Sequence, residues 1–93
     1  MSEPRTAHNT EEIKRITVQW AAEILEEPEM TAQDNFLDLG GHSILALRLC
    51  RYAAERFGVE YDIMTLFEQD LAAAAEDLAT KIASARSNPS GKE

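Results

Sequence analysis

Apolar residues recur at intervals of three and four through most of this chain, a spacing that places them on one face of an α-helix. Four segments show this pattern, and no convincing run alternates as a strand would. A chain of 93 residues with 44% hydrophobic content can build one small core and not two. The sequence therefore predicts a single all-α domain, a bundle of four helices.

The residues between these segments predict where the helices begin and end. Asn9 and Glu12 resemble a capping box for the first helix, which should run from Asn9 or Thr10 to about Glu26 and be stopped by Pro28. The second helix is expected over the run Ile44 to Phe57, after Ser43, and Gly58 should stop it. The other two are expected from Asp62 as N-cap through Phe67, and from Asp70 or Leu71 to Ala83. We expect a folded domain at residues 9–85, between flexible ends at residues 1–8 and 86–93.

A long connection without periodicity separates the first two helices, at residues 26–42. Such loops in small domains usually have a function. Four apolar residues should hold it against the helices: Met30, Phe36, Leu37 and Leu39. Gly40 and Gly41 should then provide the backbone freedom needed to turn the loop into the next helix. This connection places Ser43 at the mouth of the second helix, where a modifying enzyme could reach its hydroxyl.

The second helix has two contrasting faces on a helical wheel. Its expected core face consists of Leu45, Ala46, Leu49, Cys50, Ala53 and Phe57. Ile44, Leu47, Arg48 and Arg51 fall on the other side and form a candidate docking surface, with Met64 or Phe67 of the third helix as its second edge. The alternative for Leu47 is that it packs against the long loop.

Charge and composition exclude several classes of function. The net charge of −8 repels phosphate backbones, so nucleic acid is not an expected partner. The sequence has neither an apolar run of membrane-spanning length nor a signal peptide pattern. Cys50, the single cysteine, is expected in the core and fits a reducing compartment. We expect a monomer in the cytoplasm, without a membrane partner or a metal site.

Ser43 is not expected to act as a hydrolase nucleophile. The chain offers only His8, near the N-terminus, and His42, which directly precedes the serine and has poor reach as its base. The segment also lacks the second glycine of a nucleophile elbow. We therefore assign no catalytic residue.

The segment Asp34-x-Phe36-x-x-x-Gly40-Gly41-His42-Ser43 resembles the attachment motif of peptidyl carrier proteins, the thiolation domains of nonribosomal peptide assembly. These belong to the phosphopantetheine-binding acyl carrier superfamily. The likeness continues through Leu45, Leu47, Leu49 and Leu66-Phe67-Glu68 and covers roughly Ile13 to Ile82. His42 before the serine, where fatty-acid and polyketide carriers typically have Asp, favours the peptidyl and aryl branch. Gln69-Asp70 replaces a Pro-Thr pair common in the family.

The resemblance implies a four-helix carrier bundle in which a phosphopantetheinyl transferase attaches 4′-phosphopantetheine to Ser43, next to Gly41 and His42. The chain would not be an enzyme. It would hold an aminoacyl group received from an adenylation enzyme and present it to downstream tailoring, condensation or thioesterase enzymes of nonribosomal peptide, antibiotic or related secondary-metabolite biosynthesis. We expect a free-standing carrier. The alternatives are an acyl or aryl carrier of another pathway, and an unloaded helical interaction module in which Ser43 serves only as an N-cap.

Overall fold

The computed structural model describes residues 10–87 and shows four helices with no strand in that part of the chain. The helices are α1 (Thr10–Leu25), α2 (Ser43–Phe57), α3 (Ile63–Glu68) and α4 (Leu71–Ser87). This confirms the predicted all-α fold with a short third helix and a long connection before α2. The predicted cap Asn9 and the ends at residues 1–8 and 88–93 lie outside the described residues.

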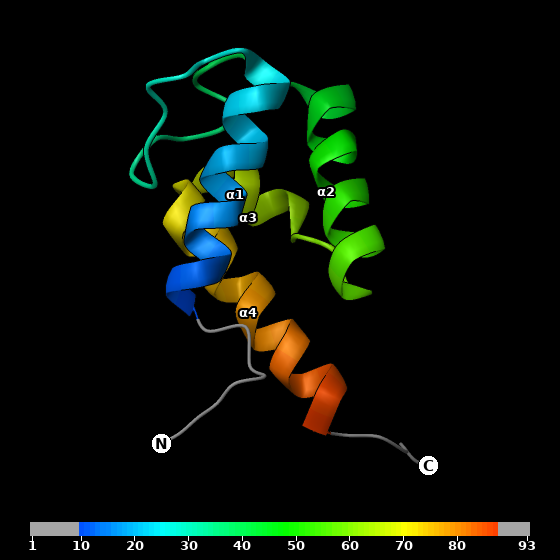
Figure 1. Cartoon of the computed structure of the whole chain (residues 1–93). Helices are drawn as coiled ribbons and strands as arrows, with labels where there is room; N and C mark the ends of the chain where they lie inside the picture. The colour runs from blue at the N-terminus through cyan, green and yellow to red at the C-terminus, as the bar shows by residue number, and fades with distance from the viewer. Residues whose placement is uncertain (1–9, 88–93) are drawn as a thin grey trace.

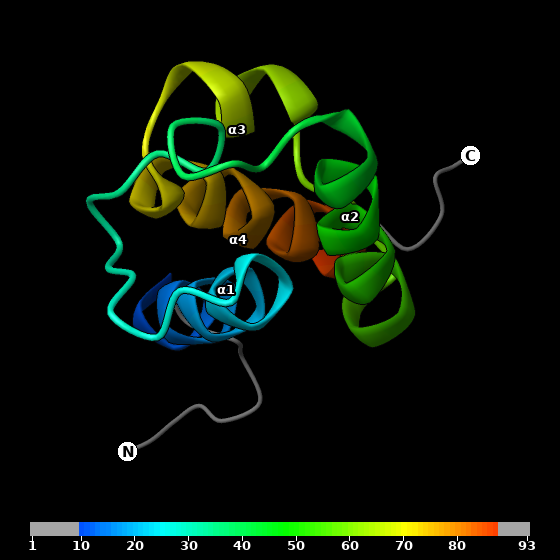
Figure 2. The same ribbon diagram turned by 90° about the horizontal axis from the view of Figure 1, so that it is seen from above.

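α1 and α4 form the most extensive helix pair of the bundle. α1 packs against both α4 and α2, and the short α3 packs against α4 (Figure 1). The connection between α1 and α2 leaves the end of α1, passes beside α3 and then enters α2 (Figure 2). Segments far apart in the sequence therefore meet next to the start of α2.

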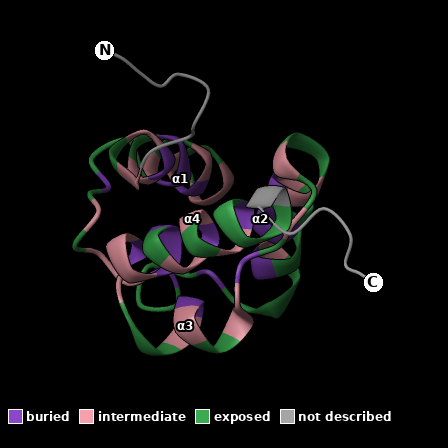
Figure 3. Ribbon diagram, turned by 90° about the horizontal axis from the view of Figure 1, so that it is seen from below, coloured by how far each residue is buried: buried purple, intermediate pink, exposed green. Residues whose placement is uncertain are grey.

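The core contains apolar side chains from all four helices and from the connecting segments (Figure 3). Its largest fully buried side chains are Phe36, Ile13, Leu49, Leu66, Leu71, Leu78 and Thr17. The predicted core face of α2 is confirmed by Ala46, Leu49, Cys50 and Ala53, which are buried, whereas Leu45 and Phe57 are partly buried. Thr17 is the polar member of the core, and its hydroxyl lies 2.6 Å from the hydroxyl of Tyr61.

Local backbone geometry and hydrogen bonds mark the end of α1, the end of α2 and the start of α3 at or next to the predicted positions. After α1, Glu26 adopts a left-handed conformation (φ 57°) and the N–H of Glu27 donates to Ala22 O at 2.9 Å, as in a Schellman motif. Gly58 ends α2 in the left-handed region (φ 81°). Asp62 begins α3 by accepting from Thr65.

Asp70 caps α4, with its Oδ1 accepting a 2.9 Å hydrogen bond from the N–H of Ala73. The Gln69-Asp70 pair thus starts this helix without the Pro-Thr pair common in the resembled family. The predicted end of α4 at Ala83 is wrong, because the helix continues to Ser87. The residues after Ala83 do not break a helix, and the next one that opposes it is Pro89. Residues 86 and 87 therefore lie in α4.

Candidate functional site

Ser43 is the first residue of α2 and is exposed. The N-cap is His42 (φ −69°, ψ −177°), and its side chain makes no capping hydrogen bond. The alternative in which Ser43 serves only as the N-cap does not fit this geometry, because His42 occupies that position. Within residues 10–87 the Ser43 hydroxyl has no hydrogen-bond partner. Helix capping does not account for the serine, and its hydroxyl faces solvent without a competing contact.

The start of α2 suits an attached anion. The first backbone bond of the helix runs from the N–H of Ala46 to His42 O at 2.9 Å, so the N–H groups of the three preceding residues have no intrahelical acceptor. The first turn contains no acidic side chain. A phosphate ester on the first helical residue would lie at the positive end of the helix dipole.

Gly40 and Gly41 shape the approach to Ser43 for different reasons. Gly40 has φ +105°, which L-residues rarely adopt, and the space around it is open. Gly41 is buried, and a Cβ there would collide with the ring and the carbonyl oxygen of Phe36. Its N–H donates to that carbonyl at 2.9 Å. The prediction that glycine provides backbone freedom holds for Gly40. At Gly41, glycine is required because the backbone packs closely against Phe36.

The loop is attached to the far end of α3 by Asn35. The side-chain amide of Asn35 donates to Phe67 O at 3.1 Å and to Gln69 O at 2.7 Å. Its Oδ1 accepts from the N–H of Asp38 at 2.8 Å. In the sequence motif Asn35 is a variable position, and only its amide, directly before the expected buried Phe36, indicates a polar anchor.

Two of the four apolar residues expected to hold the loop in place do not do so. Met30 and Phe36 are buried, but Leu37 is 44% exposed and Leu39 is 37% exposed. Consecutive tight turns, in which Leu39 N–H donates to Phe36 O and Gly40 N–H to Leu37 O, follow the buried ring. Phe36 therefore enters the core, whereas Leu37 and Leu39 are turned toward solvent in the loop that leads to Ser43.

The outer face of α2 is an apolar surface edged by positive charge. Ile44 is 67% exposed and Leu47 is 61% exposed, so the alternative that Leu47 packs against the loop is wrong. Together with Arg48 and Arg51 they line one open groove, which we call the α2 groove. Neither arginine has an ion-pair partner within residues 10–87, although the chain carries 17 acidic residues.

The two α3 candidates behave differently. Met64 is 57% exposed, whereas Phe67 is half-buried and packs against the core. Neither lines the α2 groove. The structure therefore brings four of the six candidate partner contacts together on α2 and leaves the other two on the separate α3.

Other reactive groups offer no second site. Cys50 is buried, and its Sγ donates to Tyr61 O at 3.6 Å. Burial raises the pKa of the Cys50 thiol, which keeps it in the protonated, unreactive form. Within the described residues no group of His, Cys, Asp and Glu could hold a metal ion, and none of the described helices combines the length and hydropathy needed to span a bilayer.

Comparison with known proteins relates this geometry to a family. The family model described as "Phosphopantetheine attachment site" matches residues 14–78. Ser43 is the only serine within that matched segment.

The curated relatives are much longer proteins. The chain is 48% identical over 46 residues to a dimodular nonribosomal peptide synthase of Bacillus subtilis (50% of this chain, 2% of the relative). It is 38% identical over 72 residues to a probable non-canonical nonribosomal peptide synthetase of Salinispora arenicola (77% of this chain, 1% of the relative). It is 43% identical over 47 residues to a phosphinothricin tripeptide synthetase of Streptomyces viridochromogenes (50% of this chain, 4% of the relative). The chain thus corresponds to a very small part of each.

Proposed function

The chain belongs to the phosphopantetheine attachment site family, and on that premise we propose that it is a peptidyl carrier protein with its 4′-phosphopantetheine attached to Ser43. The cofactor of the family is covalent 4′-phosphopantetheine on a serine. The observation that carries the assignment is that Ser43, the sole serine of the matched segment, is exposed at the start of α2 without a hydrogen bond in the described part of the chain.

The residues around Ser43 fit the group. The free N–H groups of the first turn of α2 would face the phosphate, and the buried Gly41 holds the loop close behind it. His42 is exposed next to the serine, where it can approach the phosphate without occupying the attachment position. When attached, the group supplies a terminal thiol that carries a cargo as a thioester.

The protein itself would contribute an address and a tether, not catalysis. Tethering raises the effective concentration of the cargo at the active site of each partner. We propose a phosphopantetheinyl transferase, an adenylation enzyme and downstream tailoring, condensation or thioesterase enzymes as partners. Similarity to parts of nonribosomal peptide synthases supports an aminoacyl cargo over a fatty acyl one.

The α2 groove, with Ile44, Leu47, Arg48 and Arg51, is our proposed partner-binding surface. Exposed aliphatic side chains can be buried against a partner, and two unpaired guanidinium groups can pair with its carboxylates. Met64 and the exposed part of Phe67 would extend this surface across α3. The free-standing form, the monomeric state and the cytoplasmic location stay predictions.

Intact mass spectrometry tests the attachment site. The purified chain is incubated with coenzyme A and a broad-specificity phosphopantetheinyl transferase, and a gain of one phosphopantetheine is expected. Ser43→Ala should abolish the gain, and the matched control Ser84→Ala, which changes an exposed serine of α4, should keep it. A folded chain that gains no mass, with a transferase active on another carrier, would refute the proposal.

The cargo requires a second measurement. Adenylation enzymes specific for amino acids, aryl acids or fatty acids can be compared for their ability to load the modified chain. Preferential loading with an amino acid supports a peptidyl carrier, and preferential loading with an aryl or fatty acid supports the alternative carriers. The attachment to Ser43 is decided separately by the mass measurement.

A further inference from the structure

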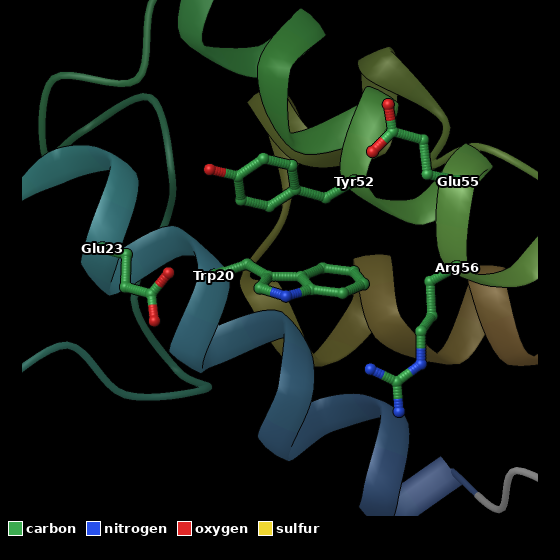
Figure 4. Close-up of a pocket in the computed structure, with 5 residues that line it drawn as sticks. All are labelled: Trp20, Glu23, Tyr52, Glu55 and Arg56. Carbon is green, nitrogen blue, oxygen red and sulfur yellow. The ribbon is translucent and has the colours of Figure 1, made fainter.

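An aromatic cleft lies between α1 and α2 and is lined by residues that take no part in the attachment of the cofactor. Trp20 and Glu23 of α1, together with Tyr52, Glu55 and Arg56 of α2, line an open volume of about 380 Å³. Figure 4 shows the rings of Trp20 and Tyr52 next to each other, with Glu23 on one side of them and Glu55 and Arg56 on the other. None of these five residues lines the α2 groove. We refer to this feature as the α1–α2 cleft.

Two aromatic rings form the body of the α1–α2 cleft. The rings of Trp20 and Tyr52 meet edge to face, with centroids 5.6 Å apart and an interplanar angle of 75°. Trp20 also contacts Phe57 at 6.0 Å. Neither the indole N–H of Trp20 nor the hydroxyl of Tyr52 has a hydrogen-bond partner within residues 10–87. The two rings therefore pack against each other, and the indole N–H and the phenol hydroxyl are available to hydrogen-bond a ligand.

The charges around the rings favour a cation. Glu23 and Glu55 are exposed, come from opposite helices and have no ion-pair partner in the described part of the chain. Arg56 is the one cation of the lining, and its guanidinium already lies over the ring of Phe57, 5.7 Å from the centroid. Two carboxylates against one guanidinium leave a net charge of −1, and the whole chain carries −8. The net negative charge of the chain attracts a positive group at long range, and the aromatic rings attract it at contact.

We propose that the α1–α2 cleft binds an alkylammonium group, which lies against the rings of Trp20 and Tyr52 in the negative field of Glu23 and Glu55, which also line the cleft. Aromatic faces and nearby carboxylates are the combination that recognises organic ammonium ions. Two sources share this chemistry: the amino group of a cargo carried by the chain, and a lysine side chain of a partner. The cargo source rests on the proposed function, whereas the binding of ammonium does not.

Choline and its neutral carbon analogue 3,3-dimethylbutan-1-ol test the binding directly. The chain contains one tryptophan, so the indole N–H resonance of Trp20 reports on the cleft in an NMR titration. We expect a saturable shift with choline and none of similar size with the neutral alcohol. Equal responses to both compounds, no response, or a linear response without saturation would overturn the proposal.

Matched variants attribute the response to the cleft. Tyr52→Leu should weaken choline binding between about twofold and fivefold, the range expected for one exposed cation–π contact, while Tyr52→Phe should retain it. The double variant Glu23→Gln, Glu55→Gln should weaken binding, and Glu68→Gln, which removes an exposed carboxylate outside the cleft, should not. If Tyr52→Leu fails to fold, the charge variants still decide the question, because undiminished binding in the double variant contradicts the proposed site.

Two further titrations separate the sources. Nα-acetyl-lysine amide, compared with its norleucine counterpart, imitates a partner side chain. Loading the modified chain with an amino acid, compared with the acid that lacks only the amino group, tests the cargo. If the indole N–H resonance of Trp20 shifts on aminoacyl loading, and the shift does not depend on protein concentration, the ligand is the amino group of the cargo. If the resonance shifts only with the lysine compound, the ligand is a lysine side chain of a partner. Failure of aminoacyl loading would count against the proposed aminoacyl cargo and leave the choline result standing.

Discussion

The side-chain amide of Asn35 donates a 2.7 Å hydrogen bond to the backbone carbonyl oxygen of Gln69, 34 positions later in the chain. The same amide donates to Phe67 O at the end of α3. One residue of the loop before Ser43 thus supplies donors to two carbonyl groups that would otherwise lack an intrahelical partner. The loop that presents the serine and the helix that carries Met64 are connected by this residue.

Replacing Asn35 should destabilise the fold. Asn35→Ala removes both donated hydrogen bonds and the one that Oδ1 accepts from Asp38, and it should lower the free energy of unfolding by about 1–3 kcal/mol, measured by urea denaturation. Asn35→Asp has almost the same size but cannot donate, so its loss should be at least as large. Gln33→Ala, at an exposed loop residue, should change stability by less than about 0.5 kcal/mol. An Asn35→Ala variant as stable as this control would show that the bonds contribute nothing net.

Gly41→Ala should be destabilised through its contact with Phe36. A methyl group at this position would overlap the ring and the carbonyl oxygen of Phe36, and overpacking typically costs about 1–3 kcal/mol. Because the ring is one of the two obstacles, Phe36→Leu should reduce the cost of the second substitution. The double variant should therefore be more stable than the sum of the single changes predicts, and strict additivity in thermal or urea denaturation would contradict the proposed collision.

The hydroxyl pair formed by Thr17 and Tyr61 should show a dependence on alkaline pH. Burial raises the pKa of Tyr61 above its ordinary value near 10, and the hydrogen bond with Thr17 only partly opposes this effect. A raised pKa means that the unfolded state releases the proton first as the pH increases. The stabilisation from the neutral hydroxyl is thus fully present below about pH 10 and is lost above it.

Tyr61→Phe tests this expectation. At neutral pH it leaves the buried Thr17 hydroxyl without its partner and should cost about 1–3 kcal/mol. The double variant with Thr17→Val removes both polar groups and should recover part of the loss. Above pH 10 the difference in unfolding free energy between the wild type and Tyr61→Phe should shrink. A difference that stays constant from pH 8 to pH 11 would exclude this residue as the source.

The α2 groove should affect encounters with partners more than stability. The double variant Leu47→Ala, Arg51→Ala changes exposed side chains and should alter the unfolding free energy by less than about 1 kcal/mol. If the groove is the docking surface, kcat/KM of a phosphopantetheinyl transferase and of an adenylation enzyme should fall by roughly fivefold or more. Arg15→Ala, which removes an exposed cation of α1, is the matched control. Unchanged kinetics of the double variant would remove the groove from the proposal.

Much of the fold could be predicted because its signals are local. Gly58 and Asp62 mark helix ends through backbone geometry and short-range hydrogen bonds at their own positions, and Pro28 follows the end of α1 by three residues. The end of α4 was missed because the residues after Ala83 contain no such signal before Pro89. Residues that break helices show where a helix can end. Their absence does not show where a helix must end.

The candidate site was predictable in part for the same reason. The motif around Ser43 and the helical wheel of α2 correctly separated exposed Ile44 and Leu47 from the buried face. They could not show that Leu37 and Leu39 point outward, since loop residues have no period that assigns them to a face. Nor could they pair Thr17 with Tyr61, which are 44 positions apart.

By itself the sequence determined the helices, the face of α2 that is buried and the placement of one serine at the beginning of that helix, because periodicity and capping act over a few neighbouring residues. Only the tertiary structure decided that Asn35 holds the loop to α3, that Gly41 must lack a side chain, and that Trp20 and Tyr52 share a cleft. Each of these features depends on the separation of atoms from distant parts of the chain, which is set when the helices pack.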